Sequence, residues 1–145
     1  MGGVGAADAA VRSPPARQPA RAIEHRPAGT LGVIGVISPW NFPLLLAMRA
    51  VAPALALGNA VVLKPDVQTA ISGGAVIAEL FTAAGLPEGL LLVLAGDAEP
   101  GQALCESPLI AMVSFTGSTA VGRQVGETAA ARSSVSRWNW VGTTP

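Results

Sequence analysis

The chain has 145 residues, of which 50% are hydrophobic and 12% charged, so it can bury the core of one ordinary domain. Nine basic and nine acidic residues balance, which leaves no general field to attract nucleic acid or anionic lipid. The apolar runs are interrupted well before the roughly 20 residues that a membrane-spanning helix needs, so the sequence indicates a soluble protein.

Residues 1–28 are rich in Ala, Gly, Pro and Arg and have no steady hydrophobic period. Such a composition buries too little apolar surface to offset the loss of chain entropy, so we expect a disordered or remnant N-terminal arm. The arm also lacks the continuous apolar core of a secretory signal peptide. The character of the chain then changes, and residues 29–132 form the predicted folded domain.

In that domain, short β-rich runs alternate with longer Ala- and Leu-rich segments. The predicted strands are Leu31–Ile37, Ala60–Leu63, Leu90–Leu94 and Met112–Phe115. The predicted helices span 44–57, 69–84, 100–105 and 119–131, and Pro53 is expected to kink or split the first of them. The alternation is typical of βαβ units, whose right-handed crossovers return each strand in the same direction. The predicted fold class is therefore α/β, with a mostly parallel sheet and flanking helices.

Ligands of such sheets bind beyond the carboxyl ends of the strands, so three segments are of interest: 38–42, 64–67 and 116–122. The third follows Phe115 and reads Thr116-Gly117-Ser118-Thr119-Ala120-Val121-Gly122. Its glycines would let a phosphate approach the backbone, and the next helix offers unpaired N–H groups. A strand-end glycine and an N-cap serine are also common structural devices, and the spacing is not the GxGxxG dinucleotide fingerprint. Both interpretations stay open on these residues alone.

The other two segments allow similar alternatives. Lys64 ends a very apolar strand, where its ammonium could hydrogen-bond ribose hydroxyls or pair with a phosphate; a solvated strand-end lysine is the alternative. Asn41 lies between Trp40 and Phe42, and its side-chain NH₂ could stabilise a developing oxyanion. The alternative for Asn41 is that this segment simply turns the chain.

Four motifs in the same order make the segment from about residue 27 to 126 resemble the aldehyde dehydrogenase superfamily. They are Ile37–Pro43 (ISPWNFP), Ala52–Pro65 (APALALGNAVVLKP), Ala84–Pro87 (AGLP) and Phe115–Thr119 (FTGST). The second motif and residues 66–70 are most similar to the benzaldehyde dehydrogenase-like branch. The resemblance implies a Rossmann-like, partial NAD(P)-binding domain.

The resemblance also implies roles for individual residues. Asn41 would be the catalytic residue that forms the side-chain half of the oxyanion hole. Lys64 would bind the adenosine ribose, Ser118 and the Gly117 backbone the pyrophosphate, and Gly101 lies where the family packs a helix against the adenine. The remaining implied cofactor-binding residues are Ile37, Ser38, Pro39 and Trp40 on the nicotinamide side, with Phe115 and Thr116 in the third segment.

One position departs from the family pattern. The family often has a glutamate three residues after the lysine, where it holds the ribose diol, and this chain has Val67. Loss of that carboxylate removes repulsion toward a 2′-phosphate. The expected cofactor is therefore NAD or NADP.

Aldehyde oxidation in this family also needs a cysteine thiolate as nucleophile and a glutamate that activates water. Cys105 lies in a predicted helix away from the family's catalytic loop, and we expect a small buried hydrophobic residue. A single cysteine and the lone His25 exclude an internal disulfide and a Cys- or His-rich metal site. They indicate a reducing, cytoplasmic setting.

Residues 133–145 do not resemble the family. One back-translation of this segment, read two nucleotides later, encodes KRVSLELGGNNP, the expected continuation with the catalytic glutamate. The sequence therefore predicts a frameshifted, non-native tail on a truncated chain. We expect such a chain to have one exposed sheet edge and one uncovered sheet face, and to aggregate.

Two functions stay open. The first is a fragment of an NAD(P)-dependent oxidoreductase whose parent, a homo-oligomer by family, oxidises an aldehyde, aromatic in the benzaldehyde-like branch, to a carboxylic acid. This chain would be inactive alone. The second is a non-catalytic dinucleotide-binding or interaction module. No nucleic-acid or membrane partner is expected, and nucleotide binding would exclude a third class, an unrelated α/β structural protein.

Overall fold

The computed structural model describes residues 29–131 and 137–138. The elements in chain order are β1 (Val33–Ile37), α1 (Pro43–Ala56), β2 (Ala60–Lys64), the 3-10 turn η1 (Val67–Thr69), the π-helical η2 (Ile71–Ala75), α2 (Val76–Ala83), β3 (Leu91–Val93), α3 (Ala98–Glu106), β4 (Ile110–Phe115), α4 (Thr119–Ala130) and β5 (Arg137–Trp138). The expectations for the N-terminal arm and for nearly all of the C-terminal tail lie outside the described residues. Within the described residues, no helix has the length and apolar character to cross a bilayer.

The strands form one parallel sheet in the order β3-β2-β1-β4-β5. Ile37 at the end of β1 pairs with Lys64 at the end of β2 and with Phe115 at the end of β4. The carboxyl ends of these three strands are therefore level at one edge of the sheet. The predicted α/β class is confirmed, and so is the shared edge for the three segments of interest.

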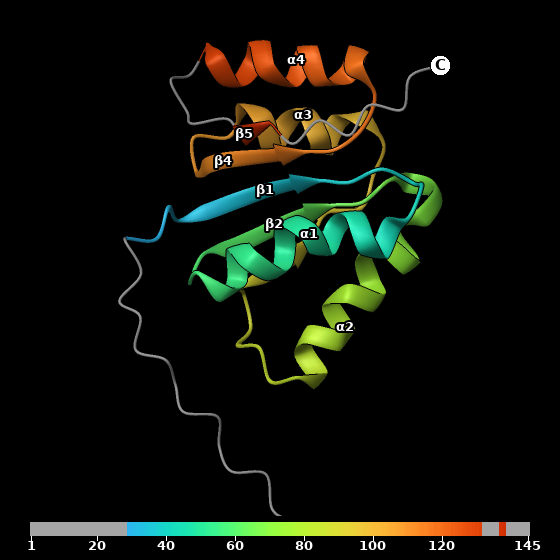
Figure 1. Cartoon of the computed structure of the whole chain (residues 1–145), viewed down its shortest axis with the longest axis vertical. Coiled ribbons are helices and arrows are strands. Elements are labelled where there is room, and N and C mark those ends of the chain that lie inside the picture. The colour runs from blue at the N-terminus through green and yellow to red at the C-terminus, as the bar shows by residue number, and fades with distance from the viewer. Residues whose placement is uncertain (1–28, 132–136, 139–145) are drawn as a thin grey trace, which may run out of the picture.

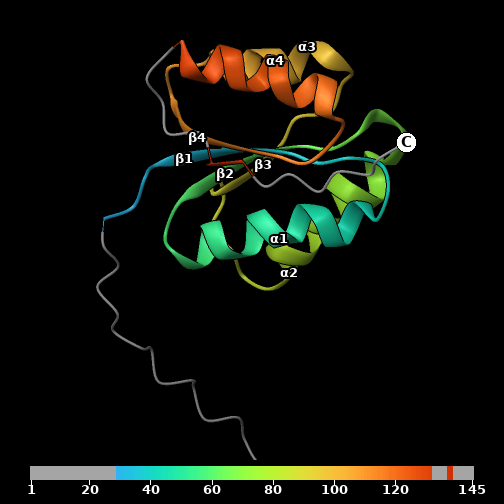
Figure 2. The ribbon, with the colours of Figure 1, turned by 45° about the horizontal axis from the view of Figure 1, so that its top comes forward.

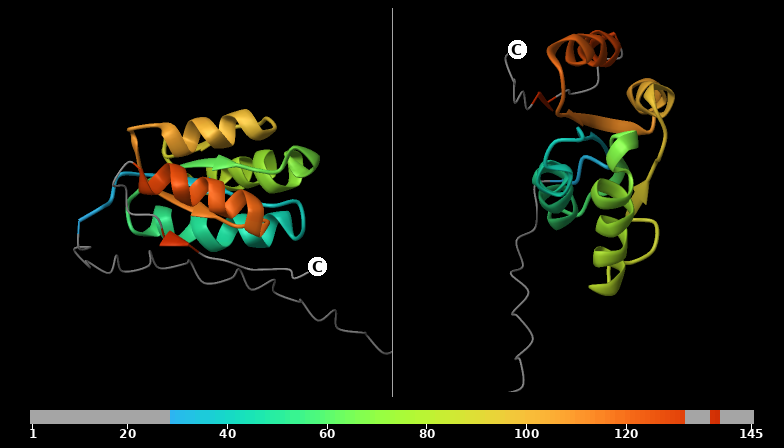
Figure 3. Two further views of the ribbon diagram at one scale, coloured as in Figure 1. Left: turned by 90° about the horizontal axis from the view of Figure 1, so that it is seen from above. Right: turned by 90° about the vertical axis from the view of Figure 1, so that its right-hand side faces the viewer.

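The order of the strands reverses once. The chain passes from β1 outward to β2 and β3, and the segment containing α3 then returns it to β4 on the other side of β1. Helices α1 and α2 cover one face of the sheet, and α3 and α4 cover the other (Figures 1 and 2). Figure 3 shows α3 and α4 running beside each other, where they pack. The expected uncovered face is therefore wrong, because each face carries two helices.

Alternate residues of β1 pack into different layers. Ile34 and Val36 are buried against α1, in a core that includes Val51. Val33 and Ile37 point to the opposite face, where they pack with α3 and β4. On that face a Cβ at Gly35 would lie 3.4 Å from Leu104 Cδ2 of α3, so the missing side chain lets this helix pack close to the sheet.

Helix α1 runs through Pro53 to Ala56, so the predicted split does not occur. Proline removes one backbone hydrogen bond and crowds the preceding turn. Here Val51 and Ala54 are buried on either side of the exposed Pro53 ring. Packing against the sheet therefore holds together a helix that local propensity alone would interrupt.

The second predicted helix is found as three pieces, η1, η2 and α2. Its irregular middle contains the buried glycines Gly73 and Gly74. A Cβ on Gly73 would lie 2.9 Å from Pro43 Cβ, and one on Gly74 would lie 2.8 Å from Pro65 Cγ. The backbone thus approaches the start of α1 and the end of β2 so closely that only glycine fits.

A buried side chain joins the opposite edge of the sheet. Asn59 Oδ1 accepts hydrogen bonds from the backbone N–H of Leu31 at 2.8 Å and Gly32 at 3.1 Å. Its Nδ2 donates to the carbonyl of Ala54 at 3.1 Å. The approach to β1, the end of α1 and the start of β2 are therefore held together by one amide.

Candidate functional site

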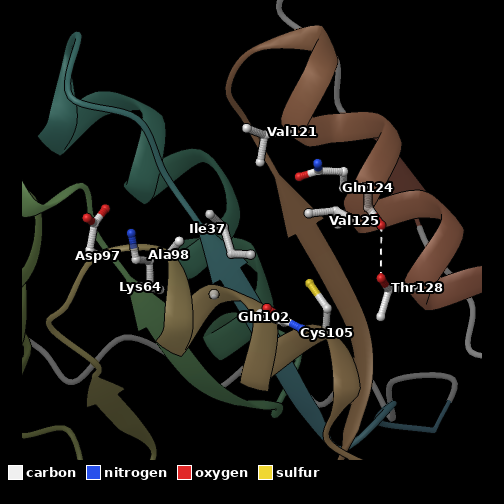
Figure 4. A pocket seen from close by; sticks show the side chains of 11 residues that line it. Ile37, Lys64, Asp97, Ala98, Gln102, Cys105, Val121, Gln124, Val125 and Thr128 are labelled. Atoms are coloured by element: carbon white, nitrogen blue, oxygen red, sulfur yellow. Dashed lines mark hydrogen bonds between the residues drawn. The ribbon is translucent and has the colours of Figure 1, made fainter.

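A cleft of about 430 Å³ opens on the sheet face that α3 and α4 cover. It lies at the carboxyl edge, near the point where the strand order reverses beside β1, the usual ligand position in open α/β sheets. Figure 4 shows its lining from β1, β2, α3 and α4. The lining residues are Ile37, Lys64, Asp97, Ala98, Gly101, Gln102, Cys105, Val121, Gln124, Val125 and Thr128.

Lys64 supplies the positive charge of the cleft. Its side chain is only 9% exposed, and within residues 29–131 its ammonium has no hydrogen-bond or ion-pair partner. Its backbone carbonyl accepts a hydrogen bond from Ser38 N at 3.1 Å, which joins β2 to the segment after β1. Most of the side chain is therefore buried, and its ammonium reaches the cleft. An ammonium that lines a cleft and is unpaired within the described residues favours a ligand that brings negative charge or hydroxyl groups.

Gly101 lines the cleft from the middle of α3. The nearest atom to a Cβ built on it would be Ile37 Cδ1 at 3.9 Å, so packing does not require a glycine here. The missing side chain instead leaves free space in the cleft. Ile37 below and Val121 and Val125 on α4 give this part of the cleft apolar walls, which suit a flat heterocycle.

The turn after β4 is organised by its own side chains. Thr116 N donates to the carbonyl of Ile37 at 3.0 Å, which fixes the turn against β1. Ser118 caps α4, since its Oγ accepts a hydrogen bond from Val121 N at 3.4 Å. A Cβ on Gly117 would lie 2.6 Å from Cζ of the buried Phe115 ring, so this glycine has a packing reason. The structural roles of the strand-end glycine and the N-cap serine are therefore confirmed. The N-terminus of α4 lies at the carboxyl edge of the sheet.

The segment after β1 lies at the same edge but does not line the cleft. Ser38 is buried, and its Oγ has no hydrogen-bond partner in the described part of the chain. Pro39 is half-buried and Trp40 is exposed. Asn41 is half-buried and precedes Phe42, which has a left-handed φ of 51°. A positive φ at a non-glycine residue is uncommon and marks a tightly constrained turn into α1.

Of the residues predicted to bind a cofactor, Ile37, Lys64 and Gly101 line the cleft. The others lie at the same sheet edge, outside its lining. Sequence reasoning found Gly101 but missed the other residues that α3 and α4 contribute, although the lining positions recur at helical spacing: 101 and 105 on α3 with 97 just before it, and 121, 125 and 128 on α4. That periodicity is readable, but it does not say which helix faces which.

Cys105 forms part of the wall and is buried, as predicted. Burial raises the pKa of its thiol above the usual value, and the nearby Glu106 carboxylate raises it further. A raised pKa lowers the fraction of thiolate, the form that attacks carbonyl carbon. The surroundings of Cys105 therefore disfavour its reactive thiolate form and do not activate it as a nucleophile.

Comparison with known proteins agrees with this geometry. The model of the aldehyde dehydrogenase family matches residues 9–138. A benzaldehyde dehydrogenase [NAD(+)] from Pseudomonas putida is 65% identical over 97 residues, which are 67% of this chain and 20% of that protein. A vanillin dehydrogenase from an Amycolatopsis strain is 59% identical over 98 residues, 68% of this chain and 20% of that protein.

Solved structures agree as well. The NAD-dependent benzaldehyde dehydrogenase from Corynebacterium glutamicum superimposes with a TM-score of 0.71 at 47% identity, over 75% of this chain and 24% of that one. The Mycobacterium tuberculosis aldehyde dehydrogenase complexed with NAD+ has a TM-score of 0.74 at 46% identity, over 79% of this chain and 24% of that one. The chain spans about a fifth of the length of the curated relatives it matches. Because the family model matches most of its residues, the chain belongs to the aldehyde dehydrogenase family.

Proposed function

We propose that this chain carries part of the nucleotide-binding domain of an NAD(P)-dependent aldehyde dehydrogenase, and that it binds the adenosine end of NAD or NADP in the α3–α4 cleft. The observation that carries the proposal is the largely buried Lys64 side chain, whose ammonium is unpaired within the described residues and faces a cleft at the reversal of the strand order. The solved relative that binds NAD+ shares this fold at 46% identity.

The residues present fit a dinucleotide. Lys64 donates hydrogen bonds to the adenosine ribose, and the space above Gly101 receives the adenine. The N-terminus of α4, with the Gly117 backbone and Ser118, faces the pyrophosphate, since unpaired N–H groups favour anions. Ile37 and the segment from Ser38 to Trp40, with Phe115 and Thr116 beside it, position the nicotinamide side.

In the whole protein, a nicotinamide bound at this edge would supply the acceptor for the hydride that leaves the substrate. Asn41 donates from its side-chain amide to the aldehyde oxygen as negative charge develops there. Because relatives are named for benzaldehyde and vanillin, we propose an aromatic aldehyde as substrate and a carboxylic acid as product. We place this enzyme in the cytoplasm as a homo-oligomer, without nucleic-acid or membrane partners.

For this chain by itself, a second function has an observation in its favour. Cys105 is the single cysteine of the sequence, and it is a buried wall residue with a raised pKa. The described residues therefore offer a nucleotide site without a nucleophile. We expect the chain to bind dinucleotide without forming reduced nicotinamide when benzaldehyde is added.

The first prediction tests binding with a natural reporter. Because Cys105 is unique and lines the cleft, saturating NAD should slow its alkylation by N-ethylmaleimide in the full 145-residue chain. The raised pKa means that thiolate accumulates only at alkaline pH, so the rate should rise with pH later than for a free thiol. Mass spectrometry measures the modified fraction, and isothermal titration measures the affinity, expected in the micromolar range.

The control for this experiment is Lys64→Met, which keeps the length and apolar stem of the side chain but removes its charge. It should retain the circular dichroism spectrum and lose both the protection and the titration heat. Equal alkylation rates with and without NAD, together with no heat in the unsubstituted chain, would remove the case for a nucleotide site.

A further inference from the structure

Two opposite charges lie at one end of the cleft. Lys64 enters it from the end of β2, and Asp97 enters it from the residue before α3. Figure 4 shows both side chains at the same end, away from Gln124 and Thr128 on α4. Asp97 is also the single acidic residue of the cleft lining within the described part of the chain.

The Asp97 carboxylate does not form a capping hydrogen bond with its own helix. Aspartate at an N-cap usually accepts a hydrogen bond from a backbone N–H in the first helical turn. Asp97 is the N-cap of α3, but its side chain makes no such bond, and the residue is exposed. The carboxylate is therefore available to a ligand in the cleft.

The residues that follow Lys64 directly in the sequence do not offer the same group. Asp66 is used locally, because its Oδ1 accepts a hydrogen bond from Gln68 N at 2.9 Å and so caps η1. Val67 is apolar and exposed. Asp97 thus supplies, from the N-cap of α3, a carboxylate on the lysine side of the cleft that the segment after β2 does not supply.

We propose that Asp97 is a specificity-determining residue that reads the 2′ position of the adenosine ribose, favouring a free hydroxyl and opposing a 2′-phosphate. A carboxylate accepts hydrogen bonds from hydroxyl groups and repels a phosphate. Without its charge, the Lys64 ammonium and the positive N-terminus of α3 would together attract a 2′-phosphate. This inference rests on the proposed function and selects NAD over NADP.

The test uses the full chain and isothermal titration with NAD and with NADP. Unsubstituted protein should bind NAD more tightly than NADP. Asp97→Asn should tighten NADP binding by roughly ten-fold and weaken NAD binding by a smaller factor, because one like-charge contact is removed and one acceptor is weakened. Asparagine caps helices as well as aspartate does, so the fold should be unaffected, as circular dichroism would verify.

Two matched variants sharpen the result. Glu99→Gln removes the same charge from the first turn of α3, at an exposed position outside the cleft lining, and should leave the NAD to NADP ratio unchanged. Adding Val67→Glu to Asp97→Asn returns a carboxylate close to Lys64 in sequence, and should restore the preference for NAD.

The outcomes separate this inference from the function on which it rests. If the unsubstituted chain binds neither nucleotide, the proposed function fails and this inference fails with it. If the chain binds NAD but Asp97→Asn leaves the ratio unchanged, or Glu99→Gln shifts it equally, the nucleotide site stands and the role of Asp97 is refuted.

Discussion

Ser118 shows how one residue can serve the fold and a ligand together. Its hydroxyl accepts the bond from Val121 N that caps α4, so the residue is explained without any nucleotide. The same position is where the proposed pyrophosphate would approach the N-terminus of the helix. A substitution that keeps the cap but changes the charge separates the two roles.

Ser118→Asp is such a change, because aspartate and serine are comparable N-caps and a negative charge suits a helix N-terminus. We expect the free energy of unfolding to stay within about 0.5 kcal/mol or to rise, while NAD affinity falls by about ten-fold through repulsion. Urea denaturation and nucleotide titration measure the two quantities. Ser118→Asn should preserve both, and unimpaired NAD binding by Ser118→Asp would move the pyrophosphate away from α4.

At the scale of elements, two helical segments each contain a glycine, but the glycine is needed for packing in one segment and for a ligand in the other. Gly74 lies in η2, where a Cβ would come within 2.8 Å of Pro65 Cγ and 2.9 Å of Val93 Cγ1. A proline ring cannot swing aside as the end of a long side chain can. Gly101 lies in α3, where a Cβ would meet only Ile37 Cδ1 at an ordinary 3.9 Å and would otherwise enter the cleft.

The same substitution should therefore act differently at the two positions. Gly74→Ala should lower the free energy of unfolding by about 1–3 kcal/mol through overpacking. Gly101→Ala should leave stability unchanged or raise it by about 0.5–1 kcal/mol, since alanine favours a helix, yet weaken NAD binding by filling the cleft. Thermal denaturation with nucleotide titration checks both. A stable Gly74→Ala, or Gly101→Ala with full NAD affinity, would contradict this account.

At the scale of the whole molecule, the two helical layers leave much apolar surface in contact with solvent. Phe42 is 73% exposed, and Leu44 and Leu45 at the start of α1 are exposed beside it. Ile71 and Leu109 are exposed elsewhere. Adjacent apolar side chains on a surface promote association.

We expect the purified full chain to self-associate as its concentration rises, with sedimentation velocity as the measurement. Leu44→Glu combined with Leu45→Glu should shift the distribution toward the 14.5 kDa monomer without changing the circular dichroism, because neither side chain is buried. The corresponding change at the isolated Leu109 should have a smaller effect. A monomer at every concentration would contradict the prediction that these exposed apolar side chains drive self-association.

Much of the architecture follows from local pattern. The strand cores around Ile34, Val61 and Val113 are apolar and short, and the intervening segments have helical period, so the α/β class and the level strand ends could be predicted. Four motifs likewise indicated the family, and the match over residues 9–138 confirms it. The burial of Cys105 was predicted on the same grounds.

The sequence by itself determined the parallel α/β sheet, the family, and the three segments at one sheet edge, because hydrophobic period and turn chemistry are local properties. Only the tertiary structure decided that α1 continues through Pro53, that the π-helical η2 contains the buried Gly73 and Gly74, and that Lys64 is buried. It alone placed Asp97 in the same cleft as Lys64, although the two are more than thirty residues apart in the chain. These features depend on which surfaces meet, and a one-dimensional pattern does not contain that information until the order of the strands is known.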